Sequence, residues 1–184
     1  TRTIAIGNSA LGTGTGGVYP IAIGFGALDN NTGNYNVGIG FKAGNESTGG
    51  GDYVLIGKSA GLYGNQNQNV YIGSEAGTGV SGNNNSNNVG VGYSALNAVT
   101  TGGSNVAVGV TSLNALTIGA NNVAIGMNAL KSEDVGNGAT AVGWGALALQ
   151  NSDSNNEITQ NVAIGLNAGG SITTAQNITF IGSG

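Results

Sequence analysis

The chain has 184 residues, of which 37 are glycine and only 7% are charged, and its formal net charge is −4. It contains no cysteine and no histidine, which excludes disulfides, thiol chemistry and histidine-based catalysis or metal binding. Its four basic residues argue against a nucleic-acid surface, and no apolar run reaches the ~20 residues of a membrane span.

A short motif recurs eleven times: two aliphatic or threonine positions flank one middle residue, and a glycine follows. These glycines, called anchor glycines below, are Gly7, Gly24, Gly40, Gly57, Gly73, Gly92, Gly109, Gly126, Gly143, Gly165 and Gly182. Eight of the ten spacings are 16 or 17 residues, and the other two are 19 and 22. Regular spacing of this kind indicates a single repeat array over residues 1–184, which we expect to be a piece of a longer fibre protein.

In chain order the motif predicts short strands at 4–6, 21–23, 37–39, 54–56, 70–72, 89–91, 106–108, 123–125, 140–142, 162–164 and 179–181. Counted from the anchor glycine, positions −3 and −1 are almost always Val or Ile. They point to one face of the strand because side chains alternate along it. We expect this face to be the core, with Val106, Val108, Val123 and Ile125 nearly inaccessible to solvent.

Position −2 points to the opposite face and is mostly Ala or Gly. Small side chains allow another backbone to approach closely. We therefore expect this column to be an interface with a neighbouring chain, represented by Ala107, Ala124, Ala141 and Ala163.

After each anchor glycine, position +3 is nearly always Ala and position +4 is Leu or Gly, which predicts a second short strand before a polar loop. A coil of 17 residues with one aliphatic pair suits a flattened, two-sided roll better than a three-sided helix with a six-residue period. The fold class is therefore predicted as all-β, a parallel β-solenoid of about eleven coils stacked about 4.8 Å apart. Asparagines that directly precede the strands are expected to form a ladder along the stack.

The repeat resembles those of phage tail-fibre proteins and of trimeric autotransporter adhesin heads. The resemblance lies in TGNYNVGIGFKAG (32–44), NVGVGYSAL (88–96), NVAVGVTSL (105–113) and NVAIGMNAL (122–130), and it runs from end to end. It implies a homotrimer of three parallel rolls, used as the shaft or head of an extracellular attachment fibre on a virion tail or a bacterial surface.

Few residues suggest a site, and no catalytic, metal or cofactor-binding set is predicted. Position +1 carries aromatic residues in four coils, Phe25, Phe41, Tyr93 and Trp144, and interface packing is favoured there over a sugar-stacking ladder. The longest coil contains Asp153, Asn155 and Glu157, which could line a binding loop, although a solvated loop is the favoured interpretation.

The functional hypothesis is a non-enzymatic fibre segment that presents or contributes to binding of a glycan or protein receptor, without cofactors and without membrane insertion. The alternative is a monomeric solenoid with a glycan-binding or ice-binding surface. Ice binding would require a threonine ladder, and the loop threonines do not share one column.

Overall fold

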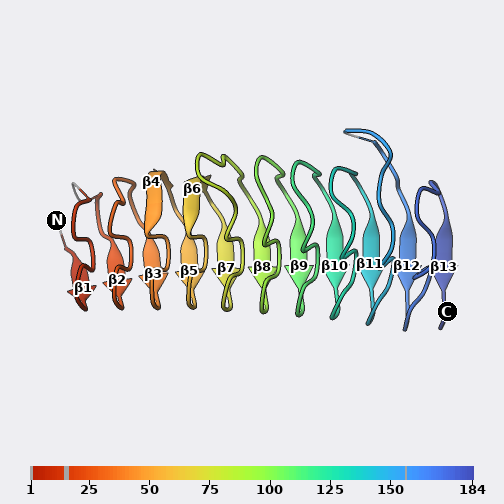
Figure 1. The fold of residues 1–184 in the computed structure, drawn as a ribbon, viewed down its shortest axis with the longest axis horizontal. Coiled ribbons are helices and arrows are strands. Elements are labelled where there is room, and N and C mark those ends of the chain that lie inside the picture. Colours follow the sequence, from red (N-terminus) through yellow and green to blue (C-terminus); the bar gives the residue numbers. More distant parts are fainter. Residues whose placement is uncertain (1, 15–16, 156) are drawn as a thin grey trace.

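The computed structural model describes residues 2–14, 17–155 and 157–184, and within these it is an all-β parallel solenoid of about ten turns with no helix (Figure 1). Each coil contributes one three-residue strand to a single eleven-stranded sheet. The strands are β1 Ile4–Ile6, β2 Ile21–Ile23, β3 Val37–Ile39, β5 Val54–Ile56, β7 Val70–Ile72, β8 Val89–Val91, β9 Val106–Val108, β10 Val123–Ile125, β11 Thr140–Val142, β12 Val162–Ile164 and β13 Thr179–Ile181. All eleven predicted strands are confirmed.

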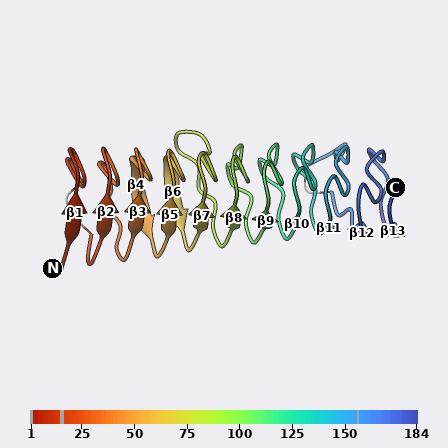
Figure 2. The same ribbon diagram turned by 90° about the horizontal axis from the view of Figure 1, so that it is seen from below.

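The coils stack in sequence order and in register, so Ala124 of β10 pairs with Ala107 of β9 on one side and with Ala141 of β11 on the other. The row is nearly straight in two perpendicular views, and the two termini lie at its opposite ends (Figures 1 and 2). A second, two-stranded parallel sheet, β4 Glu46–Gly51 and β6 Tyr63–Asn67, joins the loops of two neighbouring coils.

Both the backbone conformation and the lack of space around the Cα require glycine at the anchor positions. Gly126 has φ of 134°, and a Cβ built on it would lie 2.4 Å from the carbonyl oxygen of Gly143 in the next coil. Gly109 and Gly143 show the same close approach to the anchor that follows them. No side chain fits between the coils here, so glycine follows every strand of the main sheet.

The segment after the anchor is a turn and not the predicted second strand. Residues at positions +2 and +4 are left-handed, including Leu113 with φ of 46° and Leu130 with φ of 48°. Backbone hydrogen bonds still join the coils, as from Leu130 N to Ala146 O at 3.0 Å. These bonds and the burial of the leucines offset the cost of the left-handed residues, about 1 kcal/mol or more each.

The core lies on the opposite face of the strand from the one expected. Ala107 and Ala124 at position −2 are fully buried, whereas Ile125 is 41% exposed and Val106, Val108 and Val123 are only partly buried. The two walls of the roll are close together, and leucines from position +4 already fill much of the space between them. Only small residues fit opposite those leucines, so the β-branched side chains point outward.

This inversion also corrects the predicted interface column. Ala107, Ala124, Ala141 and Ala163 are all 0% exposed within a single chain. They are small because the opposite wall of their own roll approaches them, so they cannot contact a second chain.

Large and small residues alternate inside the roll by a simple rule. Where position +4 is Leu, the strand of the next coil has Ala or Gly at −2; a Cβ on Gly38 would lie 2.6 Å from Leu28 Cγ. Where position +4 is Gly, a larger side chain enters. At Gly44 and Gly169 it is Leu55 or Phe180 of the next coil, at 2.8 Å from the built Cβ, and at Gly77 it is Tyr71 of the same coil, at 2.3 Å. The interior volume is thus shared between the two walls.

The asparagine ladder is confirmed, but most of its hydrogen bonds join an asparagine side chain to a backbone group and not to another side chain. Asn105 Oδ1 accepts a hydrogen bond from Asn122 N at 2.9 Å, and Asn122 Oδ1 accepts one from Ala139 N at 2.9 Å. Asn122 Nδ2 donates across the coil to Gly136 O at 2.8 Å. Each buried amide therefore satisfies backbone groups that the short strands leave unpaired.

Candidate interaction surface

The outer face of the main sheet carries a mostly apolar surface that extends along the stack. We call it the aliphatic stripe and define it as positions −3, −1 and +1 of the eleven coils. The hydrogen-bond ladder continues through the anchor glycines, as from Gly26 N to Asn8 O at 2.9 Å, so position +1 follows the same alternation as −1. All but three of the exposed large apolar side chains among the described residues lie on the stripe or at its border; the exceptions are Val80, Leu149 and Ile158.

The size of the stripe is unusual for a surface in water. Ten steps of about 4.8 Å and a width of about 13 Å give roughly 600 Å² of flat apolar surface. Monomeric proteins rarely exceed this size of patch, and stable interfaces use about 800 Å² per partner. The stripe therefore has the dimensions of an interface.

Aromatic residues of the predicted +1 column are half-exposed on this stripe, from Trp144 at 45% to Tyr93 at 52%. The rings of Phe25 and Phe41 stack on each other, with centroids 5.5 Å apart and planes at 12°. Because the coils follow one another so closely, the facing surfaces of these two rings are covered by the pair itself. This arrangement favours packing against an apolar partner over stacking of a sugar on the ring faces.

The border of the stripe is position −5, whose side chains form a second outward column. In two neighbouring coils this position is aromatic, and Tyr19 and Tyr35 stack with centroids 5.7 Å apart. Farther along the array it holds mostly polar residues, including Asn121 and Gln160.

Charge interrupts the stripe at one place. Lys58 occupies position +1 after Gly57, and its Nζ lies 3.8 Å from Glu75 Oε1 in the next coil. Both side chains are accessible, so this pair contributes little to stability. It places a charged pair at one point along the length of the stripe.

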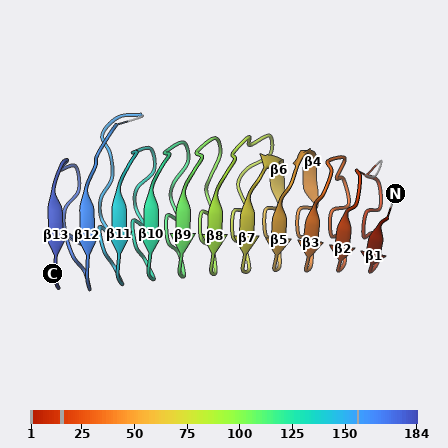
Figure 3. The same ribbon diagram turned by 180° about the vertical axis from the view of Figure 1, so that it is seen from behind.

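The predicted binding loop is held by its own contacts. Glu157 Oε2 accepts a hydrogen bond from Asp153 N at 2.8 Å, and its Oε1 accepts one from Gln176 Nε2. Asn155 is exposed, and residue 156 lies outside the described residues. The carboxylate of Glu157 thus shapes the loop, which projects beyond the loops of the other coils (Figures 1 and 3).

An open hollow lies beside this loop. Its volume is about 470 Å³, and it is lined by Ala120, Asn121, Asn137, Gly138, Ile158 and Gln160. Gly138 stands at position −5, so the outward column lacks a side chain between Asn121 and Gln160. This hollow is not among the sites predicted from the sequence; the feature that indicates it is a glycine in this column next to the longest coil.

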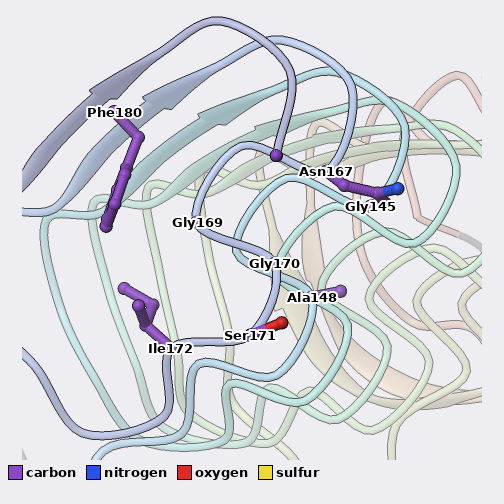
Figure 4. A pocket seen from close by; sticks show the side chains of 9 residues that line it. Gly145, Ala148, Asn167, Gly169, Gly170, Ser171, Ile172 and Phe180 are labelled. Atoms are coloured by element: carbon purple, nitrogen blue, oxygen red, sulfur yellow. The ribbon is translucent and has the colours of Figure 1, made fainter.

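A second hollow, of about 540 Å³, lies at the end of the stack (Figure 4). Phe180 and Ile172 border it together with Gly169 and Gly170. In inner coils the turn segment of the following coil fills the equivalent space. This hollow is therefore an end of the stack and not a built site.

A buried polar cluster replaces aliphatic packing in two coils. Glu133 is 0% exposed, and its Oε1 accepts hydrogen bonds from Gly136 N at 2.7 Å and Ser152 N at 3.2 Å. Its Oε2 accepts one from Gln150 Nε2 at 2.8 Å, and Gln150 Oε1 accepts one from Asn161 Nδ2 at 2.8 Å. Both oxygens of this carboxylate accept hydrogen bonds within the chain, so the cluster joins the two coils to each other.

No group of three or more Asp, Glu, His or Cys side chains arranged to hold a metal occurs among the described residues. Within the same residues there is no helix long and apolar enough to cross a membrane. No family model, no curated protein and no solved structure matches the chain.

Proposed function

We propose that the chain is a non-enzymatic structural segment of a homotrimeric attachment fibre, outside the cell on a phage-type tail or a bacterial surface. The single observation that supports it is the aliphatic stripe, a mostly apolar outer face that runs the length of the roll. Burying this face against further copies of the chain removes it from water along the whole stack. The three-fold symmetry and the location come from the repeat resemblance.

The rest of the molecule agrees with a mechanical role. Coil-to-coil hydrogen bonds, in-register strands and the asparagine ladder repeat along the axis, so each coil is held by its neighbours. A rigid rod of this kind can carry a receptor-binding part at a distance. The alternative, a monomeric solenoid, would leave the stripe in water.

Assembly is tested with two matched variants, each of which replaces one exposed aliphatic residue with aspartate. Ile125→Asp places a charge in the middle of the stripe, and Leu149→Asp places one on an exposed loop residue away from it. Light scattering should give three chain masses for the wild type and for Leu149→Asp, and one chain mass for Ile125→Asp. Circular dichroism should be unchanged in both variants, because neither side chain enters the core.

A wild-type chain that remains at one chain mass over a wide concentration range would overturn the fibre proposal. A stable dimer would keep the stripe as an interface and overturn the three-fold symmetry.

A further inference from the structure

We propose that the hollow at Gly138 binds a neutral carbohydrate unit. It is formed within a single chain, so the inference stands independently of the proposed fibre. Its volume of about 470 Å³ falls within the roughly 300–1,000 Å³ typical of small-molecule sites.

The hydrogen-bonding groups of the hollow are amides that remain available. Asn137 Oδ1 accepts a hydrogen bond from Ala120 N at 2.6 Å, which fixes this side chain and leaves its Nδ2 free to donate. In the part of the chain that the structure describes, the exposed side chains of Asn121 and Gln160 make no hydrogen bond. Carboxamides donate and accept side by side, which matches neighbouring hydroxyl groups of a sugar.

The apolar wall of the hollow comes from the long coil. Ile158 is 61% exposed although it is aliphatic. It is held in place by a parallel bridge between its backbone and Asn137. A pyranose ring has an apolar C–H face as well as hydroxyl edges, and the isoleucine beside three amides offers surface to both.

Other ligand classes fit the hollow less well. None of its six lining residues is charged, so it offers no specific partner to an anion or a cation. A peptide adding as a strand would need free backbone groups. Asn137 N already donates to Glu157 O at 2.8 Å, and Asn137 O already accepts from Thr159 N at 3.0 Å.

The test uses a variant whose side chain occupies the hollow without disturbing the fold. Gly138 has φ of 76°, and a Cβ built there meets only Gln160 Cγ, at 4.0 Å. Asparagine tolerates this conformation, as Asn121 does with φ of 59° in the preceding coil. Gly138→Asn should therefore fold and complete the outward column. The matched control is Gly82→Asn, an exposed glycine in a distant coil with φ of 82°, where a built Cβ meets nothing within 4 Å.

The probes are methyl glycosides of glucose, galactose, mannose and N-acetylglucosamine, each titrated against the assembled protein by saturation-transfer and amide NMR. At least one should shift the side-chain amide signals of Asn121 and Gln160. Gly138→Asn should weaken that binding at least about tenfold, and Gly82→Asn should leave it unchanged. Absence of binding by the wild type, or equal binding by Gly138→Asn, would overturn the proposal. Light scattering of the same samples reports assembly separately.

Discussion

At the scale of single residues, the anchor glycines set the conditions under which coils can stack. Gly126→Ala adds a Cβ 2.4 Å from Gly143 O at φ of 134°, so both backbone strain and overlap oppose it. We expect a loss of about 3 kcal/mol or more in the free energy of unfolding, measured by denaturant titration. Gly82→Asn is the control, because its φ of 82° is also left-handed but a Cβ there meets nothing within 4 Å. Similar losses in both variants would contradict the argument from close approach.

The buried Glu133 makes a second prediction at this scale. Glu133→Leu restores the residue type that Leu116 supplies at the same position one coil earlier. It also removes the acceptor of Gly136 N and Ser152 N, and one of the two acceptors of Gln150 Nε2. We therefore expect a loss of about 3 kcal/mol in unfolding free energy, and a smaller loss for Glu133→Gln, which keeps one acceptor oxygen. A leucine variant as stable as the wild type would show that the cluster is dispensable.

Two buried tyrosines predict an alkaline limit to stability. Burial raises the pKa of the Tyr71 phenol, which donates to Asn85 Oδ1 at 2.7 Å, and burial raises the pKa of Tyr53 as well. In the unfolded chain both phenols ionise near their usual pKa of 10.0. Since the folded chain keeps its protons longer, their contribution is fully present below pH 10 and falls as the pH rises above it.

The measurement is unfolding free energy against pH for the wild type and for Tyr71→Phe. The variant should lose about 1 kcal/mol at neutral pH through its missing hydrogen bond. Above pH 10 its stability should fall less steeply than that of the wild type. Parallel curves above pH 10 would contradict the assignment to Tyr71.

At the scale of elements, the two walls of a coil divide the interior volume between them. A double variant can move the large side chain from one wall to the other. A Cβ on Gly77 would lie 2.3 Å from Tyr71 Cδ2, so Gly77→Leu alone should clash and destabilise the roll. Tyr71→Ala alone should leave a cavity. The double variant has Ala at −2 and Leu at +4, as the coils of β9, β10 and β11 do. The φ of 57° at Gly77 is close to that of the leucines at +4, so a leucine fits this backbone.

The double variant should be more stable than either single variant, with a coupling energy of at least about 1 kcal/mol in a double-mutant cycle. Gly90, at −2 of the following coil, leaves room for the new leucine as Gly38 does for Leu28. Additive losses would mean that the walls do not share volume as described.

At the scale of the whole molecule, the array should tolerate loss of one entire coil but not of part of one. Deleting residues 110–126 joins Gly109 to Met127 and keeps every column in register. We expect a folded stack about 4.8 Å shorter, with unchanged assembly, measured by small-angle scattering. Deleting only residues 110–117 shifts the columns that follow and should prevent native assembly. Equal behaviour of the two deletions would contradict a register-dependent stack.

The inverted core changes what an interior substitution does to the whole molecule. Because Ala124 is fully buried inside its own roll, Ala124→Trp should unfold the coil instead of only separating chains. Ile125→Asp, one residue later, should separate chains and leave the coil folded. These neighbouring residues thus distinguish the inside of the roll from its outside.

The sequence by itself determined the period, the position of every main-sheet strand and the register of the stack. These features depend on local chemistry: glycine where nothing else fits, β-branched residues in strands and asparagine beside unpaired backbone. Alternation along the strand likewise separated Ala124 from Val123 and Ile125 onto opposite faces.

Only the tertiary structure decided which of those faces is inward, because the answer depends on the distance between the two walls of the roll. That distance is set by Leu113 and Leu130, whose left-handed turn segments bring their side chains inside and leave room only for alanine opposite. The hollow at Gly138 was equally hidden from the sequence. It requires Ile158 to lie beside a residue twenty positions earlier, and only the course of the long coil places it there.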